Sequence, residues 1–120
     1  MNKFKQTTIV TQEQTAIALG SGTLPVFATP VMIAFIENTA MNHYAPSLKE
    51  GTTTVGIEMS TTHEKASIIG EEITCESEIT QIDGRKIQFS ITCFNKQNQI
   101  IGRATHSRFV VDIEKFMNKL

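Results

Sequence analysis

Residues 30–44 read PVMIAFIENTAMNHY, and this stretch decides the fold. Its opening residues, Val31 to Ile36, leave no polar face, and Pro30 suits the first position of a helix, where no intrahelical hydrogen bond is lost. A helix that is hydrophobic all round is normally buried. We therefore expect a buried central helix from Pro30 to Tyr44, about four turns long.

Glu37 is the one ionisable acid within that helix. Burying a carboxylate is costly unless it is paired or hydrogen-bonded, so Glu37 must meet a partner. Two roles stay open for it. It is either a functional carboxylate or a structural one that accepts hydrogen bonds from loop amides.

The length and charge of the chain limit its class. With 120 residues and a formal net charge of −1, the sequence suits a single domain, residues 1–120, and argues against nucleic acid as a partner. No run approaches the ~20 apolar residues of a membrane span, and none has the pattern of a signal peptide. We therefore expect no membrane association and a cytoplasmic location.

The cysteines and histidines form no metal motif. Cys75 and Cys93 lack a CxxC spacing, which favours small buried side chains over a disulfide or a metal site. No HExxH or Cys/His cluster is present, so no metal is expected. His43 and His106 are expected at the surface or at an interface.

An alternating pattern follows Gly51. Val55, Ile57 and Met59 alternate with polar residues, which predicts a strand with these three on the core side. Continuing the alternation places His63 on the same side. That direction makes His63 a candidate site residue, although an ordinary histidine in a turn fits the sequence as well.

Two further alternating segments, 71–81 and 85–94, predict a hairpin with a three-residue loop at 82–84. The register that gathers the apolar residues on one face places Cys75 opposite Ile91. The two cysteines are then diagonal neighbours, which argues further against a disulfide.

The remaining pattern predicts four more elements: a strand at 5–10, a short helix at 12–19, a last strand at 99–111, and a short helix or turn at 112–117. One buried helix followed by antiparallel strands implies an α+β domain with a sheet wrapped around one long central helix. A sheet of about five strands covers only one side of that helix, so we expect a homodimer.

Several stretches resemble the fluoroacetyl-CoA-thioesterase-like family of hotdog-fold proteins, and the resemblance covers nearly the whole chain. These stretches are Val26-Phe27-Ala28-Thr29-Pro30 leading to Glu37, Thr53-Thr54-Val55-Gly56, His63, Asp83-Gly84-Arg85-Lys86 and Arg108-Phe109-Val110-Val111. The resemblance implies a hotdog fold, an antiparallel sheet wrapped around one helix. It also implies dimers whose acyl-CoA sites lie at the subunit interface.

The resemblance also implies roles for single residues. Thr29, Glu37 and His63, separated by 8 and 26 positions, match the family's catalytic threonine, glutamate and histidine. Gly56 matches the glycine whose amide faces the thioester carbonyl oxygen. The expected function is hydrolysis of a small acyl-CoA, and no cofactor is implied because CoA is part of the substrate.

Thioester hydrolysis needs an attacking oxygen, a base and donors to the oxyanion. His63 can be the base, while Glu37 can orient a water, hold the imidazole or attack the carbonyl itself. Thr29 can be a nucleophile, a hydrogen-bonding member of the site, or only the cap of the central helix. The sequence does not choose the nucleophile.

The acyl group and the CoA contacts are less defined. The helix at 12–19 lies where the family's substrate lid is found. The lining expected from Thr11, Thr15, Gly22 and Thr23 is polar, which favours a generic small acyl-CoA over a fluorinated one. Basic candidates for the CoA phosphates are Lys65, Arg103 and Arg108.

Two other functions are compatible with the same fold. One is a protein that binds acyl-CoA or another small ligand without turnover. The other is a hotdog dehydratase, which would usually carry a histidine on or near the helix. The helical carboxylate of Glu37 and the position of His63 beyond a strand favour hydrolysis.

Overall fold

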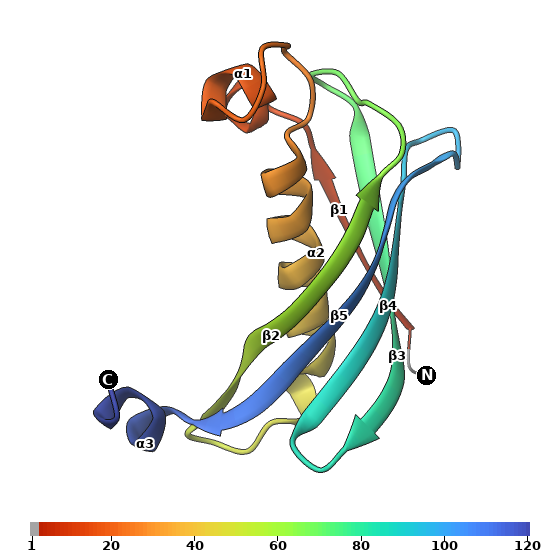
Figure 1. The fold of residues 1–120 in the computed structure, drawn as a ribbon. Helices are drawn as coiled ribbons and strands as arrows, with labels where there is room; N and C mark the ends of the chain where they lie inside the picture. The colour runs from red at the N-terminus through yellow and green to blue at the C-terminus, as the bar shows by residue number, and fades with distance from the viewer. Residues whose placement is uncertain (1–2) are drawn as a thin grey trace.

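The computed structural model describes residues 3–120. Its elements, in order, are β1 (Lys3–Ile9), a 3₁₀ turn (Gln12–Gln14), α1 (Ala16–Leu19), α2 (Thr29–Tyr44), a second 3₁₀ turn (Ala45–Ser47), β2 (Thr52–His63), β3 (Glu72–Asp83), β4 (Lys86–Phe94), β5 (Ile100–Asp112) and α3 (Ile113–Asn118). Figure 1 shows α2 along the inner face of a curved sheet, with α1 near one end of α2 and α3 near the other.

The sheet has five strands in the order β1-β3-β4-β5-β2, and every pairing is antiparallel. The predicted α+β architecture, one long helix against an antiparallel sheet, is confirmed. The strand β2 lies at an edge, so its outer side presents backbone N–H and C=O groups that no strand of residues 3–120 pairs.

The helix α2 packs on the sheet through Met32, Ile36 and Ala40, all fully buried. At Gly102 of β5 the helix comes so close that an added Cβ would lie 2.8 Å from the Met32 sulfur. Ala34, on another side of α2, is exposed in this single chain. As expected from the sequence, the sheet of one chain covers only one side of α2.

A β-bulge in β2 changes which residues face the helix. The register with β5 shifts between Gly56 and Glu58, leaving Ile57 as the extra residue. Met59 packs against the core as predicted, but Ile57 is 52% exposed. Because one inserted residue reverses the alternation, Gly56 and His63 face the same side of the sheet although they are seven positions apart.

The hairpin of β3 and β4 has another register than the one predicted. Asp83 pairs with Lys86, which leaves a two-residue turn, and a bulge shifts the register between Ile79 and Gln81. The alternation of apolar residues does not reveal such an inserted residue.

In the observed register Cys75 lies directly opposite Cys93, and the two form a disulfide. The sequence-based expectation of two free, diagonal cysteines is wrong for this reason. Stable disulfides are typical of proteins in oxidising compartments, so this disulfide does not support the expected cytoplasmic location. That location stays a prediction. Within residues 3–120, no helix is both long and apolar enough to cross a membrane.

The segment before α2 differs from the single helix predicted at 12–19. It consists of a 3₁₀ turn and the short α1, joined at the buried Thr15, whose hydroxyl caps α1 by accepting from Ala18 N at 3.3 Å. Gly20 ends α1 with a φ of 80°, the left-handed conformation expected of a C-cap glycine. This segment is tied to the start of α2, because Ala28 N donates to the Gln14 carbonyl at 2.9 Å.

Candidate active site

Thr29 and His63 are brought together at the start of α2. The Thr29 hydroxyl oxygen lies 2.8 Å from His63 Nδ1, and either atom can donate. Thr29 is the first residue of α2, and Ala28 occupies the N-cap position. The predicted capping role of Thr29 is therefore wrong, and its hydroxyl bonds to the imidazole instead.

His63, at the end of β2, is half-buried, and its ring lies edge-on to Phe27 with 6.4 Å between ring centroids. Burial lowers its pKa below 6.5, and the backbone of Lys65 raises it in part. The contact with the Lys65 backbone does not reach hydrogen-bond geometry. The buried Nε2 of His63 therefore has no hydrogen-bond partner within residues 3–120. The imidazole is thus held in its neutral form, with one nitrogen on Thr29 and the other available.

A cavity of about 250 Å³ adjoins this pair. Its lining includes Thr29, Pro30 and His63 together with Ala16 and Ser21 from the segment at α1. The placement of α1 over the cavity agrees with the lid position expected from the sequence. The volume is small for a ligand site, below the ~300 Å³ at which drug-sized pockets begin.

Glu37 lies further along α2, next to Gly56 of β2. A Cβ added to Gly56 would lie 3.2 Å from Glu37 Oε2, 3.3 Å from His106 Cε1 and 3.4 Å from Arg108 Nη1. The glycine therefore leaves the room in which the carboxylate, the imidazole and the guanidinium gather. Within one chain, Glu37 faces this cluster and acts on the charges of His106 and Arg108.

Arg108 is buried and held from several sides. Its Nε donates to Thr54 Oγ1 at 2.8 Å, its Nη2 donates to the Thr54 carbonyl at 3.0 Å, and its Nη1 lies 3.2 Å from His106 Nε2. Burial lowers the pKa of Arg108, while the negative charge of Glu37 raises it. Arg108 thus places a fixed positive charge beside Glu37.

His106 is 2% exposed, so the expectation of a surface or interface residue is wrong. Its Nδ1 lies 2.6 Å from the Glu58 carbonyl, which can only accept, so Nδ1 carries the proton and Nε2 accepts from Arg108. Burial lowers the pKa of His106 first of all, and the Glu58 carbonyl offsets part of this effect. Both nitrogens of this neutral ring are satisfied.

Sequence reasoning did not find His106 and Arg108 as neighbours of Glu37. A signal was present, because both lie an even number of positions from the apolar Ala104 and so share its face in a regular strand. Without the register of β2 against β5, nothing pointed that face at Glu37.

The two groups of residues are separate within one chain. Glu37 lies eight residues after Thr29, a rise of about 12 Å along the helix. One group pairs Thr29 with His63, and the other joins Glu37 to Gly56, His106 and Arg108. One chain therefore presents two half-sites.

The basic residues predicted to meet CoA phosphates are mostly engaged elsewhere. Arg103 Nε lies 3.1 Å from Glu64 Oε2 in an exposed ion pair, and Arg108 is buried as described. Lys65 is exposed. Among residues 3–120, no three His, Cys, Asp or Glu side chains are grouped so that they could hold a metal ion.

The sequence matches the family described as fluoroacetyl-CoA-specific thioesterase over residues 10–114. A curated relative, the fluoroacetyl-CoA thioesterase of Streptantibioticus cattleyicolor, is 30% identical over 95 residues, which cover 79% of this chain and 68% of that protein. These findings confirm the resemblance noted in the sequence.

Solved structures agree. A variant of the fluoroacetyl-CoA-specific thioesterase FlK in complex with fluoroacetate and CoA superimposes with a TM-score of 0.89 at 27% identity, covering 95% of each chain. A hot-dog-like protein from Thermanaerovibrio acidaminovorans, at 14% identity, shares the fold with a TM-score of 0.88, covering 98% of this chain and 86% of that one. The predicted hotdog fold is confirmed, and the chain belongs to the fluoroacetyl-CoA-specific thioesterase family.

Proposed function

We propose that this chain hydrolyses small acyl-CoA thioesters to the free acid and CoA, using Thr29, Glu37 and His63. The observation that carries the proposal is the 2.8 Å contact between the Thr29 hydroxyl and His63 Nδ1. It joins a hydroxyl to an imidazole, which is the arrangement expected of a base that takes the proton of an attacking oxygen. Membership of a thioesterase family supports the reaction class.

His63 acts as the general base in this proposal. It takes the proton of the attacking oxygen, which forms a bond to the thioester carbonyl carbon. The carbon–sulfur bond then breaks, and the proton passes to the departing sulfur of CoA. The attacking oxygen belongs either to Thr29, with water releasing the acid in a second step, or to a water that Glu37 orients.

The half-sites join across a homodimer. Two β2 edges can pair antiparallel about a two-fold axis midway between Gly56 and His63, which lie about 23 Å apart along the strand. The Gly56 region of one strand would then lie opposite the His63 end of the other. Glu37 and Gly56 of one protomer would then face Thr29 and His63 of its partner. The exposed Ala34 side of α2 supports a covering partner.

The size of the cavity beside Thr29 supports a small acyl group. A cavity of about 250 Å³ bordered by α1 leaves room for a short chain rather than a long fatty acid. Gly56 would contribute its backbone amide to the oxyanion, since it lacks a side chain that would keep the substrate away.

Free thiol released from a panel of acyl-CoAs, from acetyl to decanoyl and aromatic, tests the activity. We expect the shortest acyl groups to react fastest, and His63→Ala and Glu37→Gln each to lower kcat by about 10² to 10⁴. Equal rates for the wild type and both variants would reject catalysis by these residues. Stabilisation by acyl-CoA without turnover would identify a binding protein instead.

Mixing the variants tests the shared site. Dimers formed randomly from His63→Ala and Glu37→Gln protomers are half heterodimers, each with one intact site if the site is shared, so about a quarter of wild-type activity should return. A site contained in one chain would give no recovery. A monomer on gel filtration would also reject the shared site.

A further inference from the structure

His106 is a buried histidine that the proposed mechanism does not use. It is 2% exposed, and its ring stacks on Phe89, with 6.1 Å between ring centroids and 29° between ring planes. Both ring nitrogens are bonded: Nδ1 donates to the Glu58 carbonyl at 2.6 Å, and Nε2 accepts from Arg108 Nη1 at 3.2 Å. The ring is therefore fixed in one tautomer, with its proton on Nδ1.

The guanidinium of Arg108 depends on His106 to be held at all three nitrogens. Thr54 accepts from Nε and Nη2, at 2.8 and 3.0 Å, and His106 is the acceptor for Nη1. Nη1 is also the nitrogen that faces Glu37. It lies 3.4 Å from the Cβ position built on Gly56, and Glu37 Oε2 lies 3.2 Å from the same point. His106 thus fixes the end of Arg108 that faces the carboxylate.

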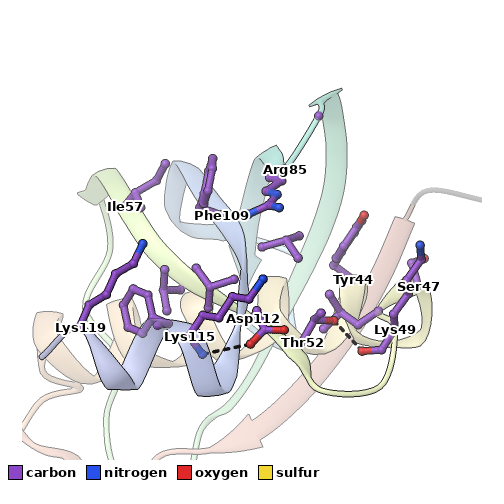
Figure 2. Close-up of a pocket in the computed structure, with 16 residues that line it drawn as sticks. Tyr44, Ser47, Lys49, Thr52, Ile57, Arg85, Phe109, Asp112, Lys115 and Lys119 are labelled. Atoms are coloured by element: carbon purple, nitrogen blue, oxygen red, sulfur yellow. Dashed lines mark hydrogen bonds between the residues drawn. The ribbon is translucent and has the colours of Figure 1, made fainter.

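The carbonyl that orients His106 comes from the β-bulge of β2. The register with β5 shifts at the extra residue, Ile57, directly before Glu58. A bulge disrupts the strand ladder locally, and here the carbonyl after it accepts from a side chain. Figure 2 shows Ile57 and Phe109 bordering a separate cavity of about 850 Å³ next to α3, whose lining includes neither His106 nor Arg108. The bulge therefore supplies a carbonyl to the cluster while its extra side chain lies elsewhere.

Only the neutral form of His106 can hold Arg108. A proton on Nε2 would turn this acceptor into a donor facing the N–H of Nη1, and would place a second positive charge beside the guanidinium. Burial lowers the pKa of His106 first of all, and the Glu58 carbonyl raises it in part. The charged groups that face His106 are Arg108 of its own strand and Glu37 of α2, while β2 adds the Glu58 carbonyl and β4 the uncharged Phe89.

We propose that His106 is a positioning residue for Glu37: in its neutral form it fixes Arg108, and the fixed guanidinium holds the carboxylate in its place for hydrolysis. The proposal rests on the proposed function, in which Glu37 belongs to the site. Attraction between a guanidinium and a carboxylate that lie together away from water favours one position of the carboxylate. The chain then has a second histidine, besides His63, that must be neutral for turnover.

Two substitutions of His106 separate positioning from packing. His106→Leu keeps an apolar side chain against Phe89 but removes the acceptor for Arg108. We expect kcat to fall about 10- to 100-fold, with KM within about twofold of the wild type. His106→Gln can donate to the Glu58 carbonyl and accept from Arg108, so it should restore kcat to within about threefold. An unchanged kcat in His106→Leu would overturn the proposal.

His43→Leu is the matched control. His43 also contacts Phe89, with 6.1 Å between ring centroids, but its Nδ1 lies 2.9 Å from Ser77 Oγ rather than from a residue of the Glu37 cluster. Its loss should leave kcat as in the wild type. An equal loss of kcat in the two leucine variants would overturn the proposal, because it would reflect packing at Phe89.

The pH profile gives a readout that a structural role would not move. Because His63 and His106 must both be neutral, the logarithm of kcat/KM should fall at low pH with a slope that approaches about two. In His106→Gln only one of these groups still titrates, so the slope should approach about one. The same slope in the wild type and in His106→Gln would overturn the proposal, and this comparison decides it even if His106→Leu does not fold.

NMR tests the contact without turnover. Exchange of the Arg108 Nε proton with water should be slow in the wild type and in His106→Gln, and about tenfold faster in His106→Leu. Equal exchange in the wild type and in His106→Leu would overturn the proposal. If the wild type releases no thiol from any acyl-CoA while the exchange differs as expected, the proposed hydrolysis fails and the fixing of Arg108 by His106 is supported.

Discussion

The Thr29 hydroxyl and His63 Nδ1 lie 2.8 Å apart although 34 positions separate them in the chain. The contact joins the first turn of α2 to the last residue of β2. It depends on the packing of the helix on the sheet rather than on local sequence. Both side chains border the small cavity under α1.

Substitution at Thr29 should separate its chemical role from its structural one. Thr29→Ser keeps the hydroxyl and should retain most of kcat, whereas Thr29→Val should lose about 10²-fold or more. Thr29 is exposed and caps no helix, so both variants should unfold at nearly the wild-type denaturant concentration. Thr105→Val, at an exposed position of β5, is the control, and an equal loss of kcat in that variant would contradict a specific role for the Thr29 hydroxyl.

Gly56→Ala should disturb the cluster around Glu37. The new Cβ would lie 3.2 Å from Glu37 Oε2, which is tighter than an ordinary contact, so we expect a loss of about 1–3 kcal/mol in the free energy of unfolding and a lower kcat. Urea unfolding in the wild-type and Glu37→Ala backgrounds measures the coupling. If the substitution costs as much when Glu37 is shortened, the contact with the carboxylate is not the cause.

Arg108→Met should be far more destabilising than the same change at Arg103. Arg108 is buried and donates to Thr54 and His106, so its loss leaves buried acceptors unpaired and should cost about 2–4 kcal/mol. Arg103 pairs with Glu64 on the surface, where solvent screens the two charges, so its loss should cost little stability. Similar unfolding midpoints for the two variants would contradict the assigned role of Arg108.

The histidines should make both activity and stability sensitive to acid. Burial lowers the folded-state pKa of His43, His63 and His106 below 6.5. The unfolded chain therefore takes up these protons first as the pH falls, so stability is full above pH 6.5 and declines from there through the folded-state values. Unfolding free energies between pH 8 and pH 5 measure this, and a maximum below pH 6 would contradict it.

The activity profile follows from the same shift at His63. A histidine acts as a general base only when it is neutral. Because burial lowers the pKa of His63, kcat/KM should still be high at pH 6.5 and should decrease at lower pH, as His63 of the substrate-free enzyme takes up a proton. A decrease in kcat/KM centred above pH 6.5 would show that another group is the base.

The central helix and the strand near His63 could be predicted because strong patterns specify them. The apolar run 31–36 identified the helix, and the alternation up to Met59 placed His63 on the helix side. The bulges could not be predicted, since an inserted residue leaves no mark on composition. That is why the pairing of Cys75 with Cys93 was missed.

The neighbours of Glu37 were missed for a related reason. Its carboxylate is recognisable as needing a partner, but His106 and Arg108 come from a strand about 70 positions later in the sequence. Which residues of β5 stand opposite Gly56 is a matter of tertiary register, and no short-range pattern encodes it.

The bulge at Ile57 has a consequence for how the chain tolerates change. Gly56 and His63 share a face only because one residue more than a regular strand requires lies between them. The identity of that residue matters little for the direction of its neighbours, since Ile57 itself is half exposed. Position 57 should therefore accept many side chains and yet refuse a deletion, which would turn one half of the strand over and separate the glycine from the face that carries the histidine.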